Sequence, residues 1–136
     1  MARALTRFAQ AIGYPADVPA EASDHVFLVD GGEIAASEAD GRLRLVKDLC
    51  AAGDGGAVDL AALAGYAAGR LLKEEATLAW DAAREMPVLW QDVAASADDA
   101  QLRAFFEVFA ASCDWWLARV QEGRDRGRVP ELMIVP

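Results

Sequence analysis

The chain has 136 residues, of which 54% are hydrophobic, and a formal net charge of −9. This length suits one domain with a real core, and we assign residues 1–122 to that domain and residues 123–136 to a flexible C-terminal tail. The acidic balance argues against nucleic-acid binding, which needs clustered Lys and Arg. We expect a cytoplasmic protein without membrane insertion, because no apolar run approaches the roughly 20 residues of a membrane span and the start lacks a secretory signal.

The first half of the chain predicts a helix followed by a three-stranded meander. Apolar residues recur every three or four positions in residues 2–12, which predicts a short helix that ends at Gly13. Two turn signals, Asp30-Gly31-Gly32 and Asp40-Gly41, then divide residues 25–48 into three pieces of strand length. We place the strands at about 25–30, 33–37 and 42–48.

Side-chain alternation indicates how these strands face their surroundings. In the first strand Phe27 and Val29 point one way and Val26 and Leu28 the other, so we expect both of its faces to be covered. The third strand alternates more clearly. Its residues Leu43 and Leu45 share one face, whereas Arg42 and Arg44 share the opposite one.

A second helix is predicted near residues 57–72, and its middle is unusually rich in small residues. Gly65 and Gly69 lie four residues apart and therefore on one face of this helix. Interior glycine weakens a helix by about 1 kcal/mol relative to alanine. A symmetric contact between two copies of the helix would use so smooth a face, although a plain alanine-rich composition explains it as well.

The second half of the chain predicts a hairpin and a long closing helix. The hairpin strands lie at about 76–81 and 87–93, with a loop near residues 82–85. Ser96 and Asp99 have the spacing of a capping box at the start of the helix. Apolar residues recur from Leu102 to Val120, and we expect the helix to end at Gly123. The fold class is therefore α+β, in the order α-βββ-α-ββ-α, with a twisted, mainly antiparallel five-stranded sheet packed against helices.

Reactive groups are scarce in this sequence. The only histidine, His25, starts a strand, and one histidine makes no metal cluster by itself. Cys50 and Cys113 lie far apart, match no CxxC or disulfide pattern, and fit small buried residues of a reduced compartment. We therefore predict a protein that is not an enzyme and that uses no metal and no cofactor.

Large aromatic residues are the feature that this scarcity leaves unexplained. Trp115 and Trp116 are adjacent, so at least one of them must point away from the apolar stripe of the last helix. Aromatic side chains of this kind anchor protein interfaces. The alternative is that all of them are buried in one core.

The order of elements, the size and the acidic charge together resemble the class I type III secretion chaperones, the family typified by the enterobacterial Tir chaperone. The resemblance covers residues 3–122. It rests first on the opening helix, from Leu5 to Gly13. It rests further on four strand segments, Val26-Phe27-Leu28-Val29-Asp30, Arg42-Leu43-Arg44-Leu45, Thr77-Leu78-Ala79-Trp80-Asp81 and Pro87-Val88-Leu89-Trp90. The last helix adds the aromatic segment Phe105-Phe106-Glu107-Val108-Phe109.

The resemblance implies a bacterial, non-enzymatic homodimer. Such a dimer holds the N-terminal region of a secreted effector in extended form and keeps it competent for secretion, by strand pairing and apolar grooves. By analogy the effector-binding groove consists of Leu5, Phe8, Ile12, Phe27, Val29, Ile34, Leu43 and Leu45. The dimer interface would consist of Leu63, Tyr66, Gly69, Leu78 and Trp80. The resemblance also allows contact with the secretion ATPase.

Two other kinds of function stay open at this point. A regulatory module that sequesters another protein would need the same apolar surface. A small α+β ligand-binding protein or enzyme would need polar groups that converge in a cavity. The sequence offers few candidates for this, such as Tyr66, Asp81 and Asp92, and no evident pairing among them.

Overall fold

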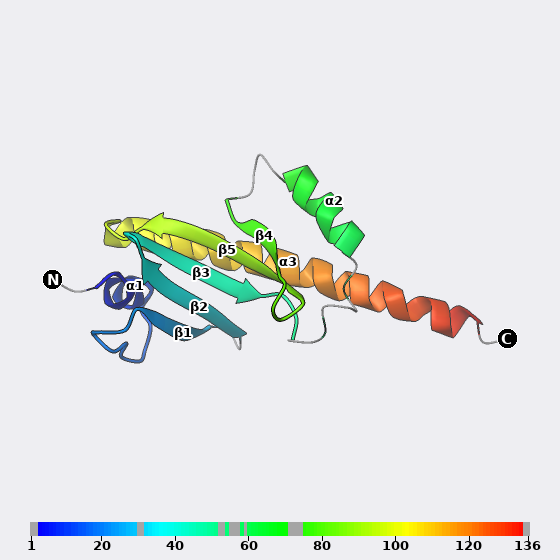
Figure 1. Ribbon diagram of the computed structural model, residues 1–136, viewed down its shortest axis with the longest axis horizontal. Helices are drawn as coiled ribbons and strands as arrows, with labels where there is room; N and C mark the ends of the chain where they lie inside the picture. Colours follow the sequence, from blue (N-terminus) through cyan, green and yellow to red (C-terminus); the bar gives the residue numbers. More distant parts are fainter. Residues whose placement is uncertain are drawn as a thin grey trace. The chain divides into compact units, whose positions relative to one another are not determined.

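The structure is a computed structural model, and it describes residues 3–29, 32–51, 54, 58, 60–70 and 75–134, the last twelve of these as backbone only. Figure 1 shows the elements. In chain order they are α1 (Ala4–Ile12), β1 (Asp24–Val29), β2 (Gly32–Ala39), β3 (Arg42–Asp48), α2 (Leu60–Arg70), β4 (Thr77–Asp81), β5 (Met86–Ala94) and α3 (Asp99–Ile134). The predicted order of elements is confirmed.

The five strands form one sheet in the order β1-β2-β3-β5-β4. The pairs β1–β2 and β2–β3 are antiparallel, with Phe27 opposite Ile34 in the first pair. Asp40 and Gly41 connect β2 to β3 with positive φ angles of 53° and 73°, as a two-residue hairpin turn requires. The predicted α+β class and antiparallel sheet are therefore confirmed, whereas the predicted turn at Asp30-Gly31 lies outside the described residues.

The chain forms two compact units, which we call unit 1 (residues 1–47 and 90–111) and unit 2 (residues 48–89 and 112–136). The single domain assigned to residues 1–122 and the flexibility of residues 123–136 stay predictions. Among the described residues, none of the helices is both long and apolar enough to cross a membrane.

The core of unit 1 is built around the apolar side of α1. Leu5 and Phe8 are completely buried, and α1 lies against β2 (Figure 1). The Phe8 ring makes edge contacts with Phe27, Phe105 and Phe106 at centroid distances of 5.3, 6.4 and 5.8 Å. One helix, one strand and the first half of α3 therefore share a single aromatic cluster.

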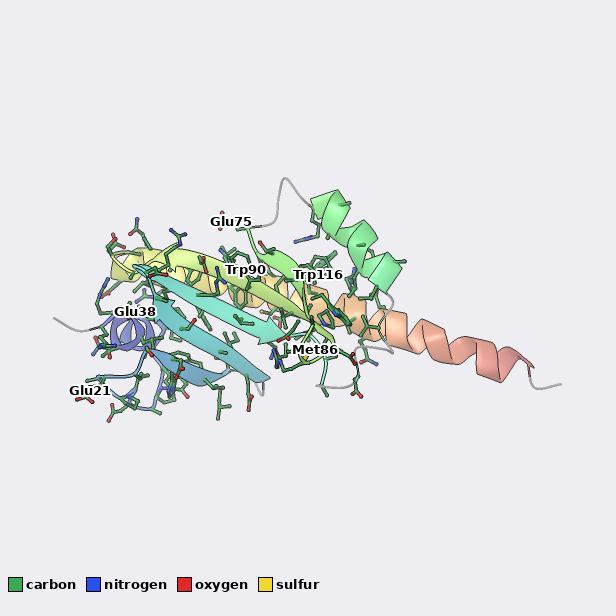
Figure 2. All side chains as sticks on the ribbon, in the orientation of Figure 1. Glu21, Glu38, Glu75, Met86, Trp90 and Trp116 are labelled. Atoms are coloured by element: carbon green, nitrogen blue, oxygen red, sulfur yellow. The ribbon has the colours of Figure 1, made fainter. Side chains whose placement is uncertain are left out.

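Polar contacts hold α1 in place at its beginning. The backbone N–H of Ala4 donates to Glu38 Oε1 at 3.0 Å, and Figure 2 shows Glu38 next to α1. The guanidinium of Arg7 donates to the carbonyl oxygens of Ala95, at 2.9 Å, and of Ala97. Because these partners come from β2 and from the segment after β5, the position of α1 depends on the finished sheet.

Unit 2 packs α2 against the second hairpin and the second half of α3. Leu63 is the buried residue of α2, and Met86 and Trp116 are almost completely buried. Arg84, in the predicted hairpin loop, donates to Asp48 at 2.7 and 2.9 Å and to Asp81 at 2.9 Å. These exposed hydrogen bonds lower the pKa of the Asp81 carboxyl and raise the pKa of Arg84.

Both ends of α3 differ from the prediction. The capping box is formed two residues further along the chain: the Gln101 N–H donates to Asp98 Oδ1 at 2.8 Å, and the Asp98 N–H donates to Gln101 Oε1 at 2.9 Å. The predicted cap at Ser96 was wrong because Asp98 offers both partners of the motif. The helix also continues to Ile134 through Gly123, Gly127 and Pro130. An interior glycine costs only about 1 kcal/mol, so Gly123 by itself is a weak stop signal.

Candidate functional site

Among the described residues of unit 1, the large apolar side chains with the highest exposed fractions lie on strand β1. Val26 is 49% exposed and Leu28 is 65% exposed, whereas Phe27 between them is completely buried. The prediction that both faces of this strand are covered was wrong. The strand lies at the edge of the sheet, and α1 contacts it on the Phe27 side through the Phe8 ring.

The backbone of β1 is unpaired along its outer edge. Within the part of the chain that the structure describes, β2 is the only strand that pairs with β1. The Glu38 N–H donates to the Ser23 carbonyl at 2.8 Å, which identifies these two as a hydrogen-bonded pair of the ladder. Since such pairs alternate along an antiparallel ladder, Asp24, Val26 and Leu28 direct their N–H and C=O groups away from β2. Val26 and Leu28 therefore expose both their backbone hydrogen-bonding groups and their side chains to a partner.

The inner side of β1 is closed by aromatic rings. Tyr14 and His25 lie 4.7 and 4.8 Å from the Phe27 ring, each edge to face. This packing explains the only histidine of the chain as part of an aromatic cluster. The cluster fixes Phe27 and with it the direction of the neighbouring side chains of β1.

The predicted groove residues divide by burial. Six of them pack inside the single chain with at most 5% of their surface exposed, namely Leu5, Phe8, Phe27, Ile34, Leu43 and Leu45. Ile12 and Val29 are partly exposed. The contribution of these eight residues to a groove stays a prediction, whereas Val26 and Leu28, which the sequence analysis left out, are accessible at once.

The opposite face of β3 carries charge, as its alternation predicts. Arg44 donates from Nε and Nη2 to the two oxygens of Asp92 at 2.7 and 2.9 Å, and its guanidinium stacks 4.1 Å above the Trp90 ring. Figure 2 labels Trp90 on β5. The hydrogen bond from Arg44 lowers the pKa of the Asp92 carboxyl, and the same bond raises the pKa of Arg44.

Unit 2 contains an apolar cavity between α2 and the second hairpin. Its volume is about 190 Å³, and it is lined by Leu60, Leu63, Ala64, Leu78, Ala79, Trp80 and Pro87. Leu60 is 50% exposed and Trp80 is 43% exposed. Three of the predicted dimer residues, Leu63, Leu78 and Trp80, therefore meet at one place.

The other two predicted dimer residues lie elsewhere on α2. The Tyr66 ring is 5.7 Å from Trp115, and the guanidinium groups of Arg70 and Arg119 stack on the same indole at 4.0 and 4.8 Å. Gly69 is exposed. Trp116 is buried and Trp115 is only partly so, which confirms that the two adjacent tryptophans point in different directions.

Groups that could support catalysis do not converge in the described part of the chain. Among those residues, the structure brings together no three His, Cys, Asp or Glu side chains that could hold a metal ion. Cys113 is buried in the apolar stripe of α3, and Cys50 is half-buried. Tyr66, Asp81 and Asp92, the polar candidates from the sequence, are engaged at three separate places, with Trp115, Arg84 and Arg44 respectively.

Comparisons with known proteins identify the fold. No protein-family model and no curated protein sequence matches the chain. A chain of the HopA1–SchA chaperone–effector complex has a TM-score of 0.64 at 17% identity and covers 84% of this chain and 90% of that one. A chain of the ExsC–ExsE complex has a TM-score of 0.64 at 17% identity, with 86% and 90% covered. A chain of the ExoT–SpcS complex from Pseudomonas aeruginosa has a TM-score of 0.58 at 17% identity, with 82% and 92% covered.

Proposed function

We propose that this protein is a non-enzymatic secretion chaperone that binds the N-terminal region of a type III secreted effector. It would hold that region in extended form in the bacterial cytoplasm and keep it soluble and competent for secretion. The observation that carries the proposal is the unpaired edge of β1 with its exposed Val26 and Leu28. The shared fold with a chain of a chaperone–effector complex supports it.

The edge of β1 suits an extended polypeptide for two physical reasons. A peptide that adds as a strand gains backbone hydrogen bonds with Asp24, Val26 and Leu28, irrespective of its sequence. Its side chains on the outer face would cover Val26 and Leu28, and full burial of a side chain of this size stabilises by about 1.5–3 kcal/mol. Edge strands that serve no partner are usually blocked by charged side chains, Pro or a bulge. Asp24–Val29 contains no Lys, Arg or Pro and pairs with β2 without a bulge, and its one charged residue, Asp24, stands at its start.

The absence of catalytic activity is part of the proposal. The described residues form no metal-ligand cluster, and His25 packs against aromatic rings. What the molecule offers to another molecule is apolar surface and unpaired backbone. Contact with the secretion ATPase stays a prediction from the family resemblance.

Co-expression with a secreted protein from the same genome tests the proposed function. We expect a stable complex that forms through the N-terminal region of that protein and persists through gel filtration. Removal of that region should abolish the complex, while removal of the remainder should preserve it. A complex that requires only the folded C-terminal part of the partner would contradict the proposal.

We further propose that two copies associate through α2 and β4. The exposed Leu60 and Trp80 beside the apolar cavity would be covered by a second copy. A Cβ atom built on Gly65 or Gly69 meets nothing within 4 Å among the described residues, so the single chain does not need glycine at either position. Gly65 and Gly69 lie on the other side of α2 from Leu60 and Leu63. A second α2 that packs against this side would explain both glycines, because small residues let two helix backbones approach closely.

The substitution Gly69→Leu should convert the dimer to a monomer. The leucine side chain enters open space in the single chain, so the monomer should keep its fold and gain up to about 1 kcal/mol of helix propensity. Light scattering measures the mass, which should fall from twice 14.5 kDa to 14.5 kDa. Ala111→Leu, at an exposed position of α3, is the control and should keep the dimer. An unchanged dimer mass for Gly69→Leu would rule out this helix contact.

A further inference from the structure

The stretch of unit 1 that carries the open edge of β1 is strongly acidic. Residues 8–41, which run from the middle of α1 to the turn after β2, contain seven Asp or Glu residues and no Lys or Arg. This stretch therefore has a formal charge of −7, compared with −9 for the whole chain. An extended partner that adds to β1 approaches charges of one sign.

Two of these carboxylates flank the exposed Val26 and Leu28 on the outer face of the sheet. Asp24 precedes Val26 by two residues on the same strand, so the two side chains share a face. Glu33 is the residue of β2 that pairs with Leu28, so it lies beside Leu28 on that face. Asp24 and Glu33 are both exposed, and neither side chain forms an ion pair within the described part of the chain.

The two arginines that β3 places on this face do not neutralise Asp24. Ser37 lies between Asp24 and Arg44 in the register, and Arg44 donates to the two oxygens of Asp92 at 2.7 and 2.9 Å. Arg42 Nε lies 3.5 Å from the same carboxylate. Asp92 therefore engages both guanidinium groups, and the uncompensated negative charge of the face lies next to β1.

A strand added to this edge places its side chains directly opposite those of β1. Because Asp24, Val26 and Leu28 direct their backbone groups outward, the residues that pair with them also point to the outer face. A Lys or Arg opposite Asp24 forms a cross-strand ion pair. A Lys or Arg opposite Leu28 covers this leucine with its methylene groups, while its charged end extends toward Glu33 on the next strand. An apolar residue between the two covers Val26.

On the basis of the proposed function, we propose that the partner segment bound at β1 is basic, with Lys or Arg two residues before and two residues after an apolar residue. Backbone pairing at a strand edge accepts almost any sequence, so Asp24 and Glu33 supply the selectivity that the edge itself lacks. Exposed charge pairs add little affinity, but like charges placed opposite each other oppose binding. Acidic segments are therefore rejected, and this rejection is the main effect of the two carboxylates.

Two synthetic peptides of about twelve residues test this inference without the natural partner. Both are rich in Val and Thr, which favour extended structure. They differ only at two positions on either side of a central valine, which carry lysine in one peptide and glutamate in the other. Fluorescence anisotropy measures binding at about 0.1 M salt, where exposed charges more than about 10 Å apart are largely screened. We expect the lysine peptide to bind the native protein about tenfold more tightly, since each position forms an attractive pair in one peptide and a repulsive pair in the other.

The double variant Asp24→Asn with Glu33→Gln should reduce this preference to about twofold. Both positions are exposed, so the fold should persist. The control is Glu107→Gln with Asp114→Asn, at exposed positions of α3, which removes the same charge and leaves β1 and β2 unaltered. It should keep the tenfold preference, whereas general attraction to an acidic protein would make both variants lose it equally.

An equal loss in both variants, no preference in the native protein, or binding of neither peptide would overturn the inference. Val26→Lys combined with Leu28→Lys separates this inference from the proposed function. If the native protein binds both peptides equally and this variant binds neither, the open edge accepts a strand and only the charge pattern is wrong. The proposed chaperone function itself is judged by the co-expression of the native pair.

Discussion

Replacing Phe8 with alanine should lower the free energy of unfolding by about 3–5 kcal/mol, the usual cost of truncating a buried phenylalanine. Phe8 has no exposed surface and contacts Phe27, Phe105 and Phe106, so the substitution leaves a cavity among three elements. Domains of this size are stable by only about 5–15 kcal/mol. Urea unfolding followed by circular dichroism measures the loss.

This prediction separates two roles for the same residue. If Phe8 lined an open groove, as the family resemblance implies, its truncation would weaken partner binding and cost little stability. Val108→Ala is the matched control, because Val108 lies on the same unit and is 43% exposed; its effect should stay within about 0.5 kcal/mol, as is usual for surface substitutions. A loss below about 1 kcal/mol for Phe8→Ala would show that the ring is not part of the core.

The double substitution of Val26 and Leu28 by lysine should weaken binding of the partner about 100-fold, or roughly 2.8 kcal/mol. Both side chains are about half exposed or more, so the fold should persist. Two lysines remove the apolar cover of the outer face and place charge on the edge, which is how many proteins block strand addition. Titration of the partner's N-terminal peptide by calorimetry measures the affinity.

The control for this variant adds the same charge at another exposed place. Thr77→Lys combined with Ala83→Lys changes the second hairpin, where both positions are exposed, and should keep the native affinity. Circular dichroism should show that the free energy of unfolding of the β1 variant stays within about 1 kcal/mol of the native value. Native affinity in a folded β1 variant would place the partner somewhere other than the edge of β1.

The order of elements could be predicted from the sequence because it depends on local signals. Asp40-Gly41 marks a turn by its chemistry, and the alternation around Leu43 and Leu45 fixes the direction of each side chain of β3. The predicted limits of β3 agree with the structure, Arg42–Asp48. The end of α3 was predicted wrongly because an interior glycine weakens a helix by only about 1 kcal/mol relative to alanine, which makes Gly123 a weak stop signal.

The binding surface could not be predicted in the same way. Val26 and Leu28 alternate with apolar neighbours, and this pattern is typical of a strand buried on both faces. Whether a strand is central or at an edge depends on the strand order, β1-β2-β3-β5-β4, which no local pattern encodes. Likewise an apolar stripe such as Leu5 and Phe8 looks the same whether a core or a groove covers it.

The open edge of β1 also has a consequence for how much of this protein a cell can make. Identical unblocked edge strands pair readily with one another, and such pairing leads to aggregation. Copies produced in excess of their partner would therefore be lost to insoluble material. The fold itself provides no protection against this pairing. Synthesis of the two proteins in matched amounts, at the same time and place, would be the simplest protection.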